Sequence, residues 1–222
     1  MALAGASAAP WPAFGAEGAD LRAEVLRTWY RLILELVRHT PTYSPPVAAR
    51  AFAWTALVAY EAVASAGGPL RSLAGQVRAL PPAPPRAPGE HAEAAVLNAA
   101  MERAVEVFFA NTGPTGQRAK AALARQMGAL VGEGVAEDVL ARSRACGFAI
   151  AEAIVAASAD DGGAVVENLG FPMEWTHGTA PGAWVPTSAI RLQQAPLLPH
   201  WGTNRPLVLS DGEACPLPPP PA

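Results

Sequence analysis

The sequence predicts an all-α fold: a bundle of about five helices, followed by a long irregular strap rich in tryptophan and proline. Apolar side chains recur at helical spacing between residues 20 and 161, in segments separated by proline or glycine. About half of the residues are apolar (51%), which is enough to build a core. We therefore expect residues 1–19 to form a flexible N-terminus, 20–161 the helical bundle, and 162–222 a strap that packs on the bundle or on a partner.

Two helices are expected first. Asp20 is placed to cap a helix of about twenty residues, which Pro41 ends. Ser44 and Pro45 then provide a cap and a first-turn proline for a second helix that runs to Gly67-Gly68. Its apolar stripe is mostly alanine, so a neighbouring helix can approach closely and this helix should be central.

Charges interrupt the second helix at Arg50 and Glu61. A buried charge needs a partner, so we expect both residues to form internal ion pairs that tie helices together.

The remaining helices follow from the same periodicity. A short helix is predicted over residues 70–80, then a stiff proline-rich connector over 81–89 inside the same domain. Further helices are predicted over about 90–110, from the turn at 111–116 to about 131, and over about 136–159. The side chains expected to face inward are Val25, Trp29, Leu32, Ile33, Leu36, Leu97, Met101, Val105, Phe108, Phe109, Leu123, Met127, Leu130, Val139, Cys146, Ile150 and Ile154.

After residue 161 the chain is too rich in proline for a helix or a central strand, yet it carries Trp175, Trp184 and Trp201, half of the six tryptophans. An apolar segment of this kind needs a surface to lie on. A segment this long without secondary structure is unusual, and it indicates a large partner surface.

Composition excludes several classes of partner. The net charge of −3 provides no basic footprint for nucleic acid or for a membrane surface. Glu61 and Glu152 interrupt the two most apolar stretches, so we expect a soluble protein without membrane insertion. The N-terminus is a poor signal peptide, which favours a cytoplasmic protein as written, or a secreted or periplasmic one if a signal has been removed. Cys146 and Cys215 allow at most one disulfide, and Cys146 is expected to be a small core residue.

The sequence contains few constellations that carry chemistry. It has no GxGxxG, GxxxxGK[ST], GxSxG or HExxH, and no Glu-x-x-His pair. Glu35 and His39 have an i,i+4 spacing that could bind a metal, but an ion pair at a helix end or an exposed histidine is the expected arrangement. His91 is expected in a solvated first turn, while His177 and His200 either line a pocket or satisfy backbone groups of the strap. No residue is assigned as catalytic, cofactor-binding or metal-ligating.

Three stretches of the chain resemble the N-terminal half of bacterial vanadium-dependent haloperoxidase-like proteins, in the superfamily of type 2 phosphatidic acid phosphatases. They are the first two helices, with Arg38-His39-Thr40-Pro41, Ser44-Pro45-Pro46-Val47-Ala48-Ala49-Arg50 and Tyr60-Glu61-Ala62, the helix from Glu93 to Phe109, and the strap from Gly182 to Leu209. The resemblance implies an all-α bundle that holds vanadate or phosphate.

The catalytic motifs of that family do not match this sequence. The family grips the oxyanion with a Lys seven residues before an Arg-Pro, a Ser-Gly-His, and a second Arg with a metal-binding His. Here Arg205-Pro206 has Leu198 seven residues earlier, Lys120 has no Arg-Pro after it, and Ser-Gly-His is absent. In the family these motifs lie beyond the strap, so vanadate or phosphate is expected only if a C-terminal catalytic half is present.

These observations lead to three hypotheses. The first is the helical scaffold half of a haloperoxidase- or phosphatase-like protein, truncated or split, inactive alone and partnered by a C-terminal catalytic half or by further copies of itself. It predicts exposed apolar surface on the free chain. The second is a stand-alone helical binding protein that has lost catalysis. The third, a metal protein using Glu35 and His39, is the weakest.

Overall fold

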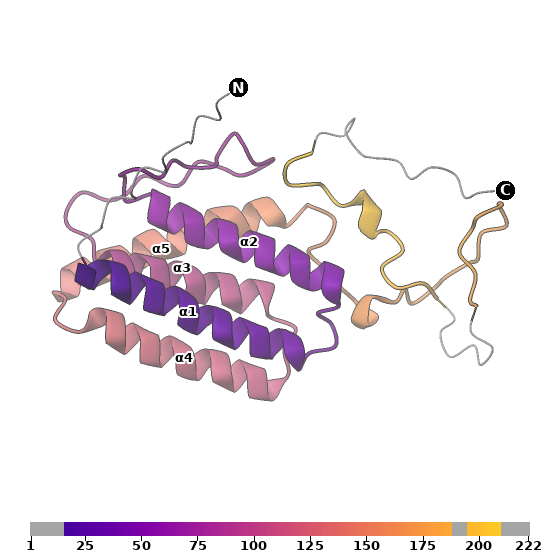
Figure 1. Ribbon diagram of the computed structural model, residues 1–222, viewed down its shortest axis with the longest axis horizontal. Coiled ribbons are helices and arrows are strands. Elements are labelled where there is room, and N and C mark those ends of the chain that lie inside the picture. The colour runs from indigo at the N-terminus through magenta and orange to yellow at the C-terminus, as the bar shows by residue number, and fades with distance from the viewer. Residues whose placement is uncertain (1–15, 188–194, 210–222) are drawn as a thin grey trace, which may run out of the picture.

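A computed structural model describes residues 16–187 and 195–209, and its described part contains five α-helices. They are α1 (Ala16–Arg38), α2 (Pro45–Ala64), α3 (Glu93–Phe108), α4 (Pro114–Gly132) and α5 (Glu137–Ser158). The helices lie side by side, and the described residues that follow α5 extend beyond one end of them (Figure 1). The all-α prediction is confirmed.

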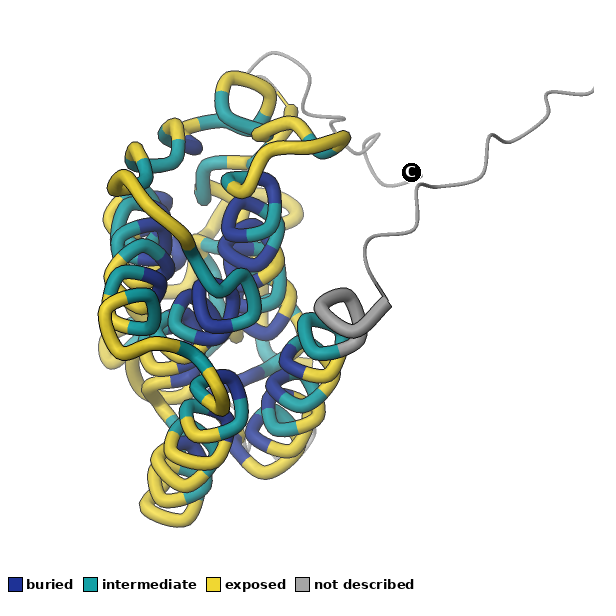
Figure 2. The backbone as a smooth tube through the Cα atoms, turned by 90° about the vertical axis from the view of Figure 1, so that its left-hand side faces the viewer, coloured by how far each residue is buried: buried dark blue, intermediate teal, exposed yellow. Residues whose placement is uncertain are grey.

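The bundle is built around α3, which contacts each of the other four helices. Its inward side chains are buried as the periodicity predicts, with Leu97, Met101 and Val105 at 1% exposure or less. The buried residues of all the helices lie on the sides that face one another (Figure 2). The central position expected for α2 therefore belongs to α3, although α2 packs closely against α3 and α5.

Helix α2 begins with Pro45 in its first turn, as predicted. Ser44 precedes it, but its side chain makes no capping hydrogen bond. By length and composition α2 is also apolar enough to cross a membrane, with a mean hydropathy of 1.3, and half of that stretch is buried inside the bundle. A core helix of a soluble bundle passes the same test, so this property is weak support for a membrane span.

Two expectations about the segments outside the core helices need correction. Helix α1 begins at Ala16, four residues before the predicted cap Asp20, so part of the segment expected to be flexible is helical. Residues 70–80 form turns and an isolated bridge between Ala74 and Val77, not a helix. Their backbone groups bond to other parts of the molecule, because the amide of Leu73 donates to Glu61 (2.7 Å) and that of Arg78 to the carbonyl of Leu207 (2.8 Å).

Candidate functional site

The strap leaves the bundle at a buried ionic network centred on Asp161, just after α5. Arg50 of α2 donates from Nε to both carboxylate oxygens of Asp161 (3.0 and 2.7 Å), and Trp54 donates from Nε1 to Oδ2 (2.7 Å). The amide of Gly163 donates to Oδ1 (2.8 Å). The carboxylate is 5% exposed, and its charge is balanced by the guanidinium. The predicted ion pair of Arg50 is confirmed, with a partner that the sequence did not identify.

Glu61, the other charge predicted to form an ion pair, is held differently. It is 1% exposed, and its Oε1 accepts from the backbone amide of Leu73. Its Oε2 has no hydrogen-bond partner among the described residues. Glu61 therefore holds the 70–80 loop against α2, and it pairs with no cation in the part of the chain that the structure describes.

The strap returns to the turn from which it leaves. The amide of Arg205 donates to the carbonyl of Asp161 (2.8 Å), and its guanidinium donates to Ala157 (2.6 Å) and pairs with Asp160 (3.0 Å). The Arg205-Pro206 dipeptide thus anchors the strap at the end of α5. The described residues between 162 and 204 belong to a long excursion that is closed at its base.

Glycine makes this closure possible at residue 163. A Cβ on Gly163 would lie 2.7 Å from both Arg50 Cδ and Asn204 Nδ2. A side chain at residue 163 would displace the side chains of Arg50 and Asn204, so the close packing at the base of the excursion favours glycine there.

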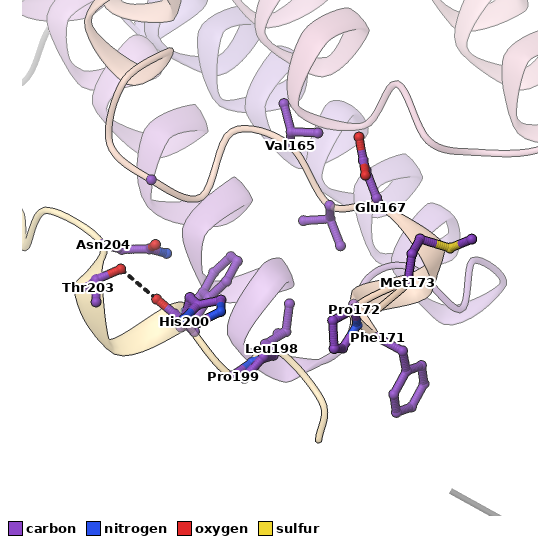
Figure 3. Close-up of a pocket in the computed structure, with 14 residues that line it drawn as sticks. Val165, Glu167, Phe171, Pro172, Met173, Leu198, Pro199, His200, Thr203 and Asn204 are labelled. Carbon is purple, nitrogen blue, oxygen red and sulfur yellow. Dashed lines mark hydrogen bonds between the residues drawn. The ribbon is translucent and has the colours of Figure 1, made fainter. Parts of the chain in front are cut away.

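The excursion forms a small hollow of about 270 Å³ that is open to solvent. Phe171, Pro172 and Met173 form one side, and Leu198 and His200 the other (Figure 3). The two sides are joined where the amide of Leu198 donates to the carbonyl of Gly170 (2.7 Å). The wall is mostly apolar, and the hydroxyl of Thr203, which also lines it, donates to the carbonyl of His200 (2.7 Å).

The strap histidines both lie against tryptophans. His177 stacks on Trp184 with ring centroids 5.7 Å apart, and His200 lies 6.2 Å from Trp175. Of these two histidines, only His200 lines the hollow in the strap. For His200, the first of the two predicted arrangements, a place in a pocket wall, is therefore the one observed.

Most of the exposed apolar surface belongs to the strap. Of the ten large hydrophobic side chains that are exposed in the described residues, eight lie between residues 165 and 209. They are Val165, Leu169, Met173, Trp184, Val185, Leu197, Val208 and Leu209. Bundle surfaces are much less apolar, with Leu34 and Phe148 as the other two. Among the described residues, exposed large apolar side chains are therefore concentrated on the strap.

The remaining predicted candidates stay apart from the strap. Glu35 pairs with His39 (3.3 Å) and Arg38 (3.8 Å) at the exposed end of α1, as expected for a helix-end ion pair. His91 is half-buried and bonds through Nδ1 to the carbonyl of Gly89 (3.1 Å), so the solvated turn predicted for it is only partly correct. In the described part of the chain, no three His, Cys, Asp or Glu side chains gather closely enough to hold a metal. Cys215, like the final prolines, lies outside the described residues.

The arrangement of helices and strap is similar to a solved enzyme structure. It matches the crystal structure of the first bacterial vanadium-dependent iodoperoxidase with a TM-score of 0.70 and 27% identity. The match covers 90% of this chain and 46% of the iodoperoxidase, so the chain spans about half the length of that protein. No family model matches the sequence, and no curated protein does. The chain has a haloperoxidase-like helical fold.

Proposed function

We propose that this chain is the helical scaffold half of a vanadium haloperoxidase- or acid phosphatase-like protein, and that its strap packs against a C-terminal half that holds the oxyanion. That half is part of the same polypeptide or of a second one. The observation that carries the proposal is the eight exposed apolar side chains on the strap, together with a match that covers 46% of the iodoperoxidase.

In this proposal the chain contributes shape and not catalysis. The Asp161 network fixes where the strap leaves the bundle, and Arg205 fixes where it returns. The strap is thereby held at the end of the bundle, where it presents an apolar face to the second half. Oxyanion sites of this class need several cationic donors and an axial His, and the sequence lacks the Lys, Arg-Pro and Ser-Gly-His pattern that supplies them. The chain alone should therefore show no peroxidase or phosphatase activity.

The experiment uses the full chain, alone and co-expressed with the coding sequence that follows it in the genome. We expect the chain alone to bind a hydrophobic dye and to self-associate, with no change in melting temperature on addition of vanadate. The co-expressed pair should form a stable complex that loses dye binding and gains vanadate binding. A following sequence without Lys-x6-Arg-Pro and Ser-Gly-His, or a pair that does not associate, would contradict the proposal.

A second candidate is a stand-alone helical binding protein. It is favoured by the bundle's own closed core, which includes Trp29, Trp54 and Ile150 at 1% exposure each, and by the hollow in the strap. It predicts a monodisperse monomer that binds little dye. Size-exclusion chromatography with light scattering separates it from the first proposal.

A further inference from the structure

The hollow in the strap contains a carboxylate that pairs with no other described residue. Glu167 lines the hollow on the same side as Met173 (Figure 3). Its backbone carbonyl accepts from the amide of Gly170 (2.8 Å), but its carboxylate forms no hydrogen bond or ion pair with the described part of the chain. His200 is the one other titratable side chain among the lining residues, and neither arginine nor lysine is among them.

The strap is acidic as well as apolar. Among its described residues it carries two acids, Glu167 and Glu174, and one cation, Arg205. Arg205 is engaged with Asp160 (3.0 Å) and with the end of α5, so it balances neither glutamate. Both acids lie beside exposed apolar surface, because Glu174 follows Met173 in the sequence and Glu167 lines the same hollow as Met173.

The backbone around the hollow adopts conformations that cost free energy. Asn168, Leu169 and Leu198 have φ angles of 45°, 56° and 49°, in the left-handed region that residues other than glycine rarely adopt. The hydrogen bond from the amide of Leu198 to the carbonyl of Gly170 (2.7 Å) joins the two strained segments. Backbone strain of this kind clusters at functional sites, which favours a role for the hollow beyond linking two segments of the strap.

A surface that covers the hollow has to compensate the charge of Glu167. Met173 and Glu167 line one hollow of about 270 Å³, so an apolar surface that covers Met173 also removes water from the carboxylate. A buried charge without a partner is strongly disfavoured, and the covering surface therefore has to supply a cation. Arginine suits this position better than lysine, because a guanidinium is weakly hydrated, pairs with a carboxylate through two parallel hydrogen bonds and stacks on aromatic rings. Phe171 and Trp201 are the aromatic residues that line the hollow.

We propose that the hollow receives the side chain of an arginine from the C-terminal half. Its guanidinium pairs with Glu167, and its hydrocarbon stem lies against Met173 and Leu198. The inference rests on the proposed function for the source of the arginine, and on the residues of the hollow for the chemistry. An ion pair inside an apolar contact fixes how two surfaces align, so this arginine sets the position of the second half on the strap.

The first test uses the full chain alone. Butylguanidinium resembles the side chain of arginine, butylammonium that of lysine, and 1-butanol carries no charge. We expect ligand-observed NMR to show saturable binding of butylguanidinium, with butylammonium several-fold weaker and 1-butanol at least tenfold weaker. Glu167→Gln should weaken the binding of butylguanidinium by tenfold or more without lowering the melting temperature, because the Glu167 side chain makes no capping hydrogen bond. Glu133→Gln removes an equal charge from an exposed position at the end of α4, and should leave binding unchanged.

The second test uses the chain co-expressed with the coding sequence that follows it. Glu167→Gln should raise the Kd of the complex by tenfold or more and reduce its dependence on salt, whereas Glu133→Gln should change neither. A pair that does not associate overturns the source of the arginine together with the proposed function, and the first test still decides whether the hollow takes a guanidinium. If butylguanidinium binds no better than 1-butanol, or if the complex forms as tightly with Glu167→Gln as with Glu133→Gln, the hollow receives no arginine and the inference is wrong.

Discussion

At the scale of single residues, Asp161 does the most to organise the molecule. Its carboxylate joins α2, the end of α5 and the first turn of the strap through Arg50, Trp54 and Gly163. A buried carboxylate is tolerable here because a guanidinium, an indole and a backbone amide all donate to it. Removal of the carboxylate leaves Nε of Arg50 and Nε1 of Trp54 without their acceptor, and Arg50 keeps its bond from Nη2 to the carbonyl of Ser158 (2.8 Å).

Asp161→Ala should therefore lower the free energy of unfolding by about 3–5 kcal/mol, because it leaves Arg50 unpaired inside the protein. Asp160→Ala is the matched control. Asp160 is 79% exposed, and Arg205 is its one ion-pair partner among the described residues, so its loss should cost less than about 1 kcal/mol. Urea denaturation followed by circular dichroism measures both. Equal effects of the two substitutions would show that the network does not stabilise the fold.

Another single residue, Tyr43, makes a pH-dependent contribution to the free energy of unfolding. It is 7% exposed, its hydroxyl donates to the carbonyl of Phe108 (3.2 Å), and burial raises its pKa to about 12. The folded state keeps the proton that the unfolded chain loses near pH 10. Its contribution is therefore complete below pH 10 and is lost as the pH rises through 12.

Tyr43→Phe should remove this alkaline sensitivity. Each pKa unit corresponds to about 1.4 kcal/mol, so the wild type should lose up to roughly 3 kcal/mol more than the variant between pH 10 and 12. Denaturant titrations at pH 8, 10, 11 and 12 test this. If the free energy of unfolding fell equally with pH in the two proteins, the ionisation of Tyr43 would not affect the stability of the fold.

At the scale of elements, the most extensive contact between two helices is that of α3 with α5, and it depends on a glycine. A Cβ on Gly147 would lie 2.1 Å from the carbonyl oxygen of Val96 and 3.0 Å from the amide nitrogen of Ala100. The two backbones can approach this closely only because residue 147 has no side chain. Glycine weakens a helix on its own, so its presence here reflects packing.

Gly147→Ala should accordingly destabilise the bundle by about 1–3 kcal/mol, because the helices must separate. Gly128 of α4 serves as a control, since a Cβ there would meet its nearest neighbour, Arg144 Nη2, at 3.5 Å. Gly128→Ala should stabilise the protein by up to about 1 kcal/mol through helix propensity. Thermal melts measure both effects. If the melting temperatures of the two variants shifted in the same direction, the close approach of α3 and α5 would not depend on glycine at residue 147.

At the scale of the whole molecule, the bundle and the strap bury their apolar residues differently. The bundle closes its own core, whereas the strap leaves Met173, Val165 and Val208 at 79%, 74% and 71% exposure. Side chains this exposed add little to the stability of the isolated chain. Their value depends on a surface that covers them.

Replacement of Val165, Met173 and Val208 by serine should leave the melting temperature within a few degrees of the wild type, while reducing dye binding and association with a C-terminal half. Ile150→Ala, at a core position with 1% exposure, should instead cost about 2–5 kcal/mol. Calorimetry and a co-purification assay measure the two effects. A triple variant that melted as early as Ile150→Ala would assign the strap residues to the core.

Helical periodicity predicted the core helices well, because a buried stripe must repeat with the helix. Val25, Trp29, Ile33 and Leu36 are all buried, and Met127 and Ile154 face inward as expected. The prediction for residues 70–80 failed for a tertiary reason. Glu61 and Leu207 take up the backbone groups of Leu73 and Arg78, and Ala79 has a φ of 59°, which is incompatible with a right-handed helix.

The sequence by itself determined the all-α class, the five core helices and the irregular strap, because spacing, proline and glycine act locally. Only the tertiary structure decided that Arg50 pairs with Asp161, 111 residues away, and that the strap returns through Arg205 to the turn it leaves. It also decided that Glu167 lines a hollow in the strap. These pairings depend on which helices meet and at what distance. A charged residue in a predicted core helix indicates that a partner is needed, but the sequence does not identify that partner.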